Sequence, residues 1–253
     1  IENNMKFVFF GTPEFATIIL EKLIKSGLKP IAVFRDPKES TSILIEKIKS
    51  LKPDLAVIAA YGKILPKEIL EIPRLGFINI HPSLLPKYRG PSPIQTAILS
   101  GDKKTGITII KIDEKMDHGP ILGKSQIPIT KSETYETLSE KLAELGAELL
   151  IKTIPDYISG KIKPVEQDHK KATYTKIIKK EDGRIDWKKS ADEIERMTSA
   201  YYPWPSAWTM WNKKILKILE ADVSNVGKKK IGEIFFNQNN ELAVACKKNN
   251  LII

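Results

Sequence analysis

Residues 77–86 read Phe77-Ile78-Asn79-Ile80-His81-Pro82-Ser83-Leu84-Leu85-Pro86, a strand pattern that runs into a proline-rich turn. Strand side chains alternate between the two faces of a sheet, so Asn79 and His81 are predicted to share a face. Pro82 lacks the amide hydrogen that a ladder needs, and the strand is therefore predicted to end at His81. Ligands of open parallel sheets bind at the carboxyl ends of strands, which is where this polar pair is placed.

The pairing of an amide with an imidazole indicates a chemistry. Together, Asn79 and His81 suit a site that holds a carbonyl oxygen while negative charge builds on it. The alternative is a strand-end histidine that only hydrogen-bonds its own loop. For a lone histidine that alternative would be the better reading, but the aligned pair before a proline-rich loop favours the functional one.

Outward from this stretch, short apolar runs alternate with helical patterns. Strands are predicted at Lys6–Phe10, Ile31–Phe34, Leu55–Ala60, Gly76–His81, Gly106–Ile112 and Ile121–Pro128. Helices are predicted from Pro13 (with Thr12 as N-cap) to Gly27, at Ile43–Leu51, from Ser92 to Gly101 and from Ser132 to about Ser159. This alternation predicts an α/β fold, with a Rossmann-like, mostly parallel sheet and helices on both faces.

A change in composition and pattern after the long predicted helix indicates a second domain. The stretch Lys161–Lys189 is polar and basic, and short strand-like runs follow from Ser206. We therefore expect a catalytic domain at 5–180, a linker with a helix at 181–205, and the start of a C-terminal OB-like β-barrel at 206–253, incomplete here. Four residues, Ile1–Asn4, precede Met5, where we expect the fold to begin.

Composition indicates an ordinary globular protein in a reducing compartment. The chain has 253 residues, of which 42% are apolar and 28% charged, enough to bury a substantial core. The single cysteine, Cys246, excludes an internal disulfide. We find no apolar run of membrane-spanning length and no signal-peptide pattern, so we expect a cytoplasmic protein without membrane association.

The net charge of +10 is unevenly placed along the chain. Residues 1–160 carry 22 Lys and Arg against 19 Asp and Glu, a net of +3, whereas residues 161–253 carry 19 against 12, a net of +7. A basic second half suggests a polyanionic partner, because phosphate contacts are mostly made by lysine and arginine. The alternative is a lysine-rich surface that only improves solvation.

A second constellation follows the fifth predicted strand. It reads Asp113-Glu114-Lys115-Met116-Asp117-His118-Gly119-Pro120-Ile121, a loop that ends in a Gly-Pro turn. A carboxylate such as Asp117 across the crevice from His81 would favour the protonated imidazole. Asp113, Glu114 and His118 are rival candidates that spacing does not separate. There is no G-x-G-x-x-G, P-loop, serine elbow or metal-ligand spacing in the chain, so no metal is expected.

Four motifs together resemble the formyltransferases that use 10-formyltetrahydrofolate. They are Asn79-Ile80-His81-Pro82-Ser83-Leu84-Leu85-Pro86, Tyr88-Arg89-Gly90, Pro93-Ile94-Gln95 and Met116-Asp117-x-Gly119-Pro120-Ile121. The branch of that family acting on methionyl-tRNA is resembled more closely still. Its motifs are Gly11-Thr12-Pro13-Glu14-Phe15, Ala60-Tyr61-Gly62-Lys63-Ile64-Leu65-Pro66, Asp182-Gly183-Arg184-Ile185-Asp186-Trp187 and Pro203-Trp204-Pro205.

The resemblance, which runs from Met5 to about Leu219, implies a reaction, a site and partners. The reaction is formyl transfer from 10-formyltetrahydrofolate to the α-amino group of methionine on initiator tRNA, for translation initiation. The implied catalytic set is Asn79, His81 and Asp117. The implied folate site lies near Tyr61, Gly62, Ile64, Ser83, Leu84, Leu85 and Pro86. The expected partners are folate and initiator methionyl-tRNA, and the expected state is a monomer.

Three departures from the family pattern stand in the sequence. A long basic loop usually follows the second strand, but here Phe34 is followed at once by Arg35-Asp36-Pro37. The family barrel extends beyond the position of Ile253. Lys115 replaces a glycine that the family often has before the Met-Asp pair. The first two departures remove expected tRNA-binding surface rather than the chemistry.

Other functions remain as alternatives. A formyltransferase acting on a glycinamide ribonucleotide would usually end without a basic barrel, whereas this chain continues past Pro205. One acting on an amino-sugar nucleotide should carry a dehydrogenase domain after this one. A non-catalytic RNA-binding protein would use the basic second half alone, and the joint presence of Asn79, His81 and Asp117 argues against it.

Overall fold

The computed structural model describes residues 5–225, 227 and 229–253, so the predicted extension Ile1–Asn4 lies outside the described residues. The chain divides into two compact units, and each is described by itself. The first unit holds the chain up to Pro93, with Thr105–Ile127 and Ser139–Thr175. The second holds Ile94–Lys104, Pro128–Leu138 and Lys176–Ile253.

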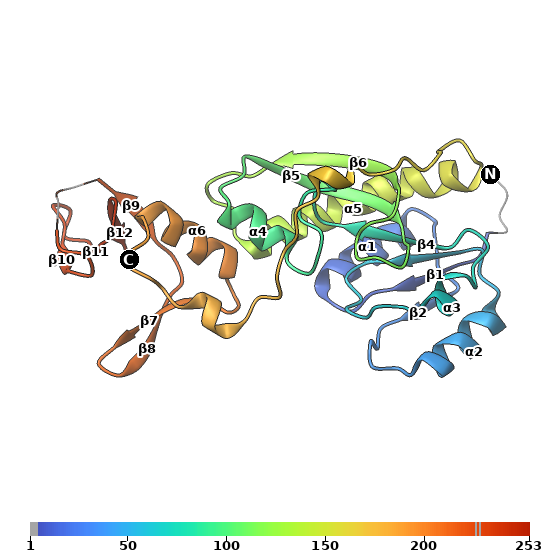
Figure 1. Cartoon of the computed structure of the whole chain (residues 1–253), viewed down its shortest axis with the longest axis horizontal. Helices are drawn as coiled ribbons and strands as arrows, with labels where there is room; N and C mark the ends of the chain where they lie inside the picture. The colour runs from blue at the N-terminus through green and yellow to red at the C-terminus, as the bar shows by residue number, and fades with distance from the viewer. Residues whose placement is uncertain (1–4, 226, 228) are drawn as a thin grey trace. The chain divides into compact units, whose positions relative to one another are not determined.

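A six-stranded sheet with the order β2-β1-β3-β4-β5-β6 forms the framework of the first unit (Figure 1). Its strands are β1 (Phe7–Phe10), β2 (Ala32–Phe34), β3 (Leu55–Ile58), β4 (Phe77–His81), β5 (Lys104–Lys111) and β6 (Ile121–Pro128). The pairs β1–β2, β1–β3 and β3–β4 are parallel, whereas β4 and β5 are antiparallel. The predicted mostly parallel sheet is confirmed.

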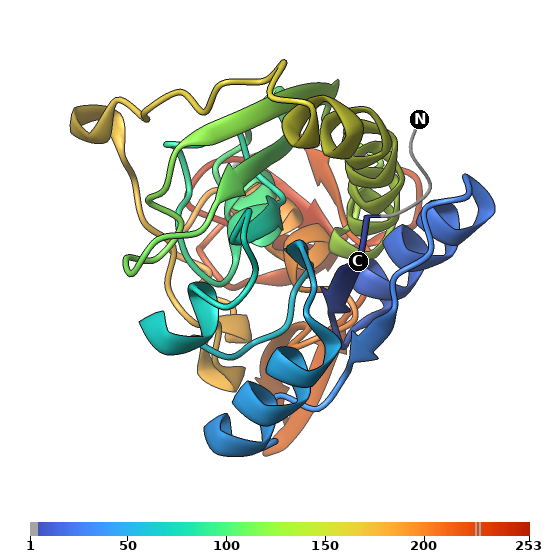
Figure 2. The same cartoon turned by 90° about the vertical axis from the view of Figure 1, so that its right-hand side faces the viewer.

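Helices cover both faces of this sheet (Figure 2). They are α1 (Glu14–Lys25), α2 (Thr41–Leu51), α3 (Lys67–Leu70) and α5 (Tyr135–Ile158), of which the first four residues belong to the second unit. On one face Val8 of β1 belongs to the same buried cluster as Leu44 of α2 and Ile69 of α3. On the other face Gly146 of α5 lies against Ile80 of β4, so close that an added Cβ would be 3.0 Å from it. The alternating side chains of the parallel strands thus supply a core on each side.

The helix starts differ from the prediction in two places. Thr12 is not the N-cap of α1, because Pro13 holds that position without a side-chain cap. Thr12 Oγ1 instead donates a hydrogen bond to the carbonyl of Arg35, 2.9 Å away, and so ties the β1–α1 turn to the segment after β2. The α2 helix begins before the predicted Ile43, since Ser40 caps it by accepting the Ile43 N–H at 3.4 Å.

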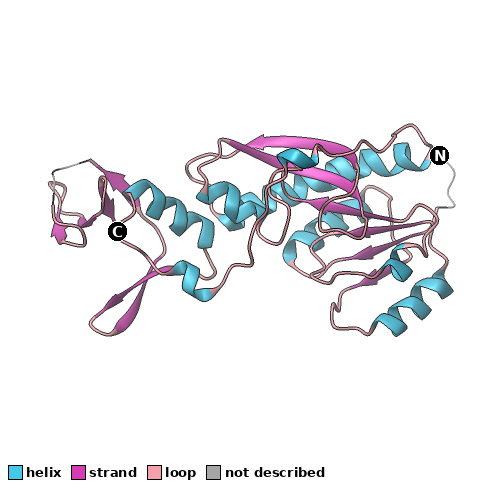
Figure 3. Cartoon of the chain, in the orientation of Figure 1, coloured by secondary structure: helices cyan, strands magenta, loops and turns pink. Residues whose placement is uncertain are grey.

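In its described residues, the second unit contains the helices α4 and α6 and two small antiparallel sheets, coloured by type in Figure 3. The α4 helix spans Pro93–Leu99 and α6 spans Ala191–Tyr201, and the 3₁₀ turn η2 (Lys180–Gly183) precedes α6. The two-stranded sheet joins β7 (Ala207–Trp211) to β8 (Lys214–Ile218), and the four-stranded sheet runs β10 (Ile234–Phe236), β11 (Leu242–Ala245), β12 (Asn250–Ile252), β9 (Asp222–Ser224). The predicted β domain is confirmed as a small antiparallel one. The sequence pattern predicts strands here at Ala207–Trp211, Ile215–Leu219, Ile231–Phe235 and Leu242–Cys246. Strand β9 was therefore not predicted, and β10 begins at Ile234 rather than at Ile231.

None of the helices in 5–225, 227 and 229–253 is both long and apolar enough to cross a bilayer.

Candidate active site

The polar pair of β4 lies where the sequence placed it. Asn79 and His81 share the strand face of Phe77, which packs in the cluster with α2 and α3. Ile80 points to the opposite face, against α5. The strand ends at His81, whose side chain is only 4% exposed. The end of a central strand therefore presents a half-buried amide next to a buried imidazole.

Asp117 completes the group from the loop between β5 and β6. Its Oδ1 lies 3.4 Å from Asn79 Nδ2 and 3.5 Å from His81 Nδ1. Its Oδ2 accepts the backbone N–H of Gly90 at 2.7 Å. The backbone of Asp117 is left-handed, with φ at 50°, a conformation that few residues other than glycine, asparagine and aspartate adopt. The structure thus brings Asn79, His81 and Asp117 together from positions far apart in the sequence.

The orientation of the His81 ring follows from its other nitrogen. Nε2 lies 2.8 Å from the carbonyl oxygen of Tyr88, and a carbonyl only accepts, so Nε2 must donate. Nδ1 then faces the Asp117 carboxylate, with which it forms an ion pair when the ring is protonated. The contacts of Oδ1 with Asn79 and His81 are both longer than ordinary hydrogen bonds, so both donors can turn to an incoming oxygen.

The rival residues of the same loop are engaged elsewhere. Asp113 Oδ2 lies 2.6 Å from His118 Nδ1, and the His118 ring stacks on that of His169 with centroids 4.0 Å apart. Glu114 pairs with Lys67 at 3.1 Å. Asp117 is the candidate that the geometry selects, a choice that sequence spacing had left open.

Gly119 allows the loop to close. A Cβ at this position would lie 1.9 Å from the carbonyl oxygen of Lys111, which is far inside van der Waals contact. The Lys111 N–H also donates to the Pro120 carbonyl at 2.9 Å, so the two strand ends meet here. Only glycine permits this approach, which accounts for the Gly-Pro turn after Asp117.

A cavity of about 580 Å³ opens beside the three side chains. Its apolar walls come from the ends of β3, β4 and β5 and from the loops that follow them. The lining includes Ile58, Tyr61, Gly62, Ile64, Leu65, Asn79, His81, Ile110, Ile112, Met116 and Asp117. Its volume and its apolar lining with a few convergent polar groups are those of a small-molecule site. Ile58, Ile110 and Ile112 were predicted only as parts of the strands Leu55–Ala60 and Gly106–Ile112, not as cavity residues.

The folate residues expected from the sequence fall into two groups. Tyr61, Gly62 and Ile64 line this cavity. Among the described residues, the second group (Ser83, Leu84, Leu85 and Pro86) is outside the lining and forms the turn after β4. In that turn the Ser83 hydroxyl donates to the Lys87 carbonyl at 2.6 Å, and the Leu85 N–H donates to the Thr108 hydroxyl at 3.0 Å.

The side chain of Tyr61, which lines the cavity, carries no charge. Its hydroxyl donates to the carbonyl of Asp36 at 2.7 Å. Burial raises the pKa of Tyr61, and the nearby charges of Glu39 and Asp36 raise it further, so the phenol keeps its proton at neutral pH. Tyr61 therefore contributes an uncharged side chain to this side of the cavity, where Lys63 is the charged residue of the same loop.

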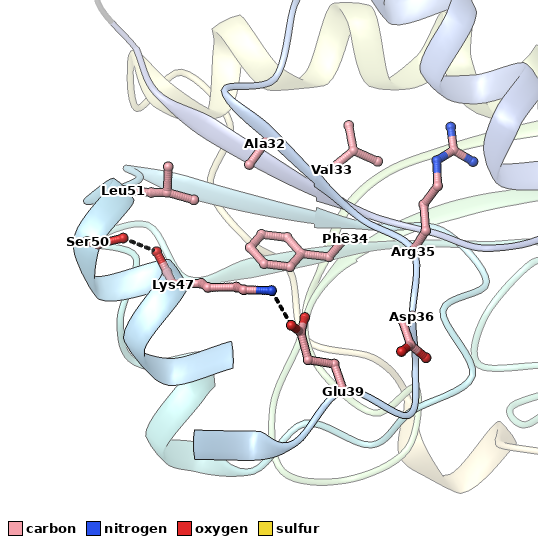
Figure 4. A pocket seen from close by; sticks show the side chains of 9 residues that line it. All are labelled: Ala32, Val33, Phe34, Arg35, Asp36, Glu39, Lys47, Ser50 and Leu51. Carbon is pink, nitrogen blue, oxygen red and sulfur yellow. Dashed lines mark hydrogen bonds and ion pairs between the residues drawn. The ribbon is translucent and has the colours of Figure 1, made fainter. Parts of the chain in front are cut away.

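A second cavity, of about 530 Å³, lies beside the edge strand β2 (Figure 4). Residues of β2, of the segment after it and of α2 line it. Lys47 reaches across it and pairs with Glu39. The charge of Lys47 is already paired with that of Glu39, and the cavity lies between the edge strand β2 and α2. This second cavity is therefore a poorer reaction site than the cavity beside His81.

The sequence leaves two roles open for Arg89 of the Tyr88-Arg89-Gly90 motif, which are to contact an anionic substrate or to clamp its own loop. In the structure its side chain clamps the loop. Its side chain is 2% exposed. The guanidinium donates to Gln167 Oε1 at 2.7 and 3.2 Å and contacts His169 Nδ1 at 2.8 Å. The sequence had not drawn attention to Gln167 or His169. Gln167 comes from the extended segment after α5, and His169 is the first residue of the 3₁₀ turn η1 (His169–Lys171).

Two family profiles match the chain and define its class. The profile described as "Formyl transferase" matches residues 31–154, and the one described as "Formyl transferase, C-terminal domain" matches residues 177–253. The first covers most of the sheet and the residues at its carboxyl end. The chain therefore has the two domains of a formyl transferase.

Curated relatives narrow the class. The methionyl-tRNA formyltransferase of Chloroflexus aggregans is 40% identical over 250 residues, covering 87% of this chain and 81% of that protein. The one from Caldanaerobacter subterraneus is 39% identical over 281 residues, covering 98% and 91%. The chain belongs to the methionyl-tRNA formyltransferase family, and its activity is the transfer of a formyl group to methionyl-tRNA. The predicted activity is confirmed, and the glycinamide, sugar-nucleotide and non-catalytic alternatives are set aside.

A solved structure supports the fold. HypX from Aquifex aeolicus in complex with tetrahydrofolic acid superposes with a TM-score of 0.78, at 19% identity, over 98% of this chain and 43% of that one. At this identity the likeness concerns the fold alone. Folate dependence follows from the formyl transferase family itself.

Proposed function

We propose that Asn79, His81 and Asp117 catalyse formyl transfer from 10-formyltetrahydrofolate to the α-amino group of methionine on initiator tRNA. The observation that carries this proposal is the position of Asp117 Oδ1, which faces both Asn79 Nδ2 at 3.4 Å and His81 Nδ1 at 3.5 Å. These three groups border the cavity of about 580 Å³. A titratable pair and an amide donor at the edge of such a cavity form a site for acyl transfer.

The chemistry places negative charge on the formyl oxygen. Asn79 Nδ2 and the protonated His81 Nδ1 donate to that oxygen as the charge develops, and each such donor contributes roughly 3 kcal/mol to lowering the barrier. Asp117 orients the ring of His81 and pairs with its charge. As the amine nitrogen bonds to the formyl carbon, Asp117, directly or through a water molecule, takes the proton that the amine releases. The bond between the formyl carbon and N10 then breaks, and that proton passes to N10 of the departing tetrahydrofolate.

The folate supplies the formyl group, and the cavity of about 580 Å³ has room for its ring system between apolar walls. Its walls at Ile58, Leu65 and Ile110 exclude water, which strengthens the electrostatic contacts of the site. The loop of Tyr61 and Gly62 presents backbone groups that can hydrogen-bond the edge of a pterin. We place the folate here rather than at the turn Ser83–Pro86.

The remaining parts of the proposal concern the acceptor and the organisation of the chain. We propose that the basic stretch after residue 160 contacts the tRNA phosphates and that the chain acts as a monomer in the cytoplasm. We also propose a boundary near residue 180 between the catalytic domain and the C-terminal part, with the linker 181–205 leading to an OB-like barrel from 206. The second compact unit also includes Ile94–Lys104 and Pro128–Leu138, which precede this boundary in the sequence.

The direct test replaces the two donors. His81→Ala and Asn79→Ala should each lower kcat about 100-fold or more, because each removes a donor that acts mainly in the transition state. The dissociation constant of tetrahydrofolate should change little. Asn239→Ala, the same chemical change in an exposed turn, is the control. Near-normal turnover of either variant with saturating folate and methionyl-tRNA would show that the oxygen is stabilised by other groups.

A further inference from the structure

The turn that carries Asp117 is held by one buried amide, the side chain of Gln167. Gln167 Nε2 donates to the carbonyl of Asp117 at 2.9 Å and to that of Gly119 at 2.8 Å. Gln167 Oε1 accepts two hydrogen bonds from Arg89, at 2.7 and 3.2 Å. The side chains are 5% and 2% exposed, respectively, so these bonds compete little with water.

The partners of Arg89 fix which way this amide points. A guanidinium only donates, so the atom of Gln167 that faces Arg89 is the oxygen. The amide nitrogen therefore faces the two carbonyls of the turn. Arg89 itself is held on its other sides by His169 Nδ1 at 2.8 Å and by the Tyr174 hydroxyl at 3.4 Å.

The backbone around Gln167 fastens the same two loops that build the site. Val165 exchanges hydrogen bonds with Ile121 at 2.7 and 2.9 Å, at the start of β6. Further along, the Arg89 N–H donates to the Thr173 carbonyl and the Thr175 N–H to the Arg89 carbonyl, each at 2.8 Å. One extended segment thus ties down the turn of Asp117.

The same segment holds the Tyr88–Gly90 loop, and that loop contacts His81 and Asp117. The Tyr88 carbonyl receives the hydrogen bond of His81, and the Gly90 N–H binds the carboxylate of Asp117. Asp117 is also held in a left-handed conformation, which its backbone keeps only while its surroundings enforce it. A disturbance at Gln167 would therefore reach His81 and Asp117 together.

We propose that Gln167 and Arg89 are positioning residues for the formyl transfer. Arg89 orients the amide of Gln167, and Gln167 holds the Asp117 turn so that the carboxylate faces Asn79 and His81. This inference rests on the proposed role of Asp117. It gives the buried arginine a part in the reaction although it does not line the cavity among the described residues.

Glutamine is the side chain whose chemistry fits all four bonds. It offers an acceptor to Arg89 and two N–H donors to the carbonyls. Glutamate has the same shape and keeps the acceptor, but it would set a carboxylate oxygen against the carbonyl oxygens of Asp117 and Gly119. Gln167→Glu therefore preserves the contact with Arg89 and removes the two bonds to the turn.

The test is formyl transfer by Gln167→Glu, with Gln126→Glu as the matched control on an exposed position of β6. We expect kcat of Gln167→Glu to fall about 10- to 100-fold, because a shift of about 1 Å in a reacting group can cost that much. The KM for methionyl-tRNA and the dissociation constant of tetrahydrofolate should stay within about twofold of the parent values. Activity equal to that of the Gln126→Glu control would overturn the proposal.

A double-mutant cycle separates positioning from general structural support. In an Asp117→Asn background, Gln167→Glu should lower kcat less than about threefold, because the charge that it positions is already gone. An equal loss in both backgrounds would make Gln167 a structural residue only. Gln167→Met removes all its hydrogen bonds without adding charge and repeats the cycle if the glutamate variant does not fold. Failure of both variants to fold would equally overturn the positioning role, whereas full activity of Asp117→Asn would overturn the proposed catalytic set itself.

Discussion

At the scale of single residues, Asp117 gives its two carboxylate oxygens different partners. One oxygen faces Asn79 and His81, and the other is fixed by the Gly90 N–H at 2.7 Å. With both oxygens assigned and the backbone left-handed, the side chain has little freedom to turn. Replacing the charge without changing the shape is therefore a clean experiment at this position.

Asp117→Asn should lower kcat at least about 100-fold, because the variant cannot pair with a protonated His81 or accept the amine proton. Transfer rates at saturating substrates measure this effect. Asp156→Asn, at a partly exposed position near the end of α5, is the control for loss of one negative charge. Should Asp117→Asn work at the parent rate, the electrostatic link to His81 would have to be abandoned.

Cys246 illustrates a residue that the reaction does not use. Burial raises the pKa of its thiol to about 11, so at about pH 8 only roughly one molecule in a thousand carries the thiolate. We expect iodoacetamide to label it far more slowly in the native chain than in guanidinium chloride, as followed by mass spectrometry. The raised pKa also means that the native state holds this proton more tightly, so stability falls as the pH rises from about 9 towards 11. Equal labelling rates in both conditions would contradict this.

The sequence predicted part of the site because part of it is local. The period of two in a strand puts Asn79 and His81 on one face from sequence alone. Asp117 needed the family resemblance, since Asp113 and Glu114 have the same chemistry within the same loop. Gln167 lies in an irregular segment without period or motif, and only the folded chain shows that its amide reaches Asp117.

At the scale of elements, the long helix α5 was predicted, whereas two of the short elements, α3 and β9, were missed. The α5 helix, with 24 residues, carries enough repeats to be recognised. The α3 helix and the β9 strand, with four and three residues, have no measurable period. They form because their neighbours in the fold provide contacts, which is information that a local pattern does not contain.

The start of α6 provides a test of local stabilisation. Ser190 Oγ accepts the Glu193 N–H at 3.3 Å, while Glu193 Oε2 accepts the Ser190 N–H at 2.9 Å, a reciprocal capping box. Ser190→Ala should destabilise the chain by about 1 kcal/mol in urea unfolding. A change below about 0.3 kcal/mol would mean that water replaces the cap without loss.

The same cap has a predictable dependence on pH. Hydrogen bonds from the backbone and side chain of Ser190 lower the pKa of Glu193. A lowered pKa in the folded state means that the stabilisation is present above about pH 4.5 and is lost as the pH falls through the folded value. Glu193→Gln should remove this part of the pH dependence of unfolding. Identical acid-unfolding profiles for the parent and Glu193→Gln would contradict it.

At the scale of the whole molecule, the proposed reacting side chains lie before residue 160 in the sequence, whereas most of the net positive charge lies after it. Asn79, His81, Asp117 and the cavity beside them belong to the first unit. The excess of positive charge belongs to residues 161–253, with 19 Lys and Arg against 12 Asp and Glu. Because phosphate contacts add affinity with little regard to sequence, this division predicts that tRNA affinity and turnover respond to different substitutions.

The hairpin of β7 and β8 is where we expect this charge to act. Lys213, Lys214 and Lys217 are all exposed on it, near the exposed ring of Trp211. Replacing the three lysines by glutamine should weaken binding of all tRNAs about equally and flatten its dependence on salt, by roughly 0.7 to 0.9 in the logarithmic slope per lost phosphate contact. The matched control replaces Lys25, Lys29 and Lys49, exposed lysines of the first unit, in the same way. Tetrahydrofolate affinity and kcat at saturating tRNA should survive in both variants. If the two triple variants lose equal affinity, the binding responds to net charge alone, and the tRNA contact has to be sought away from this hairpin.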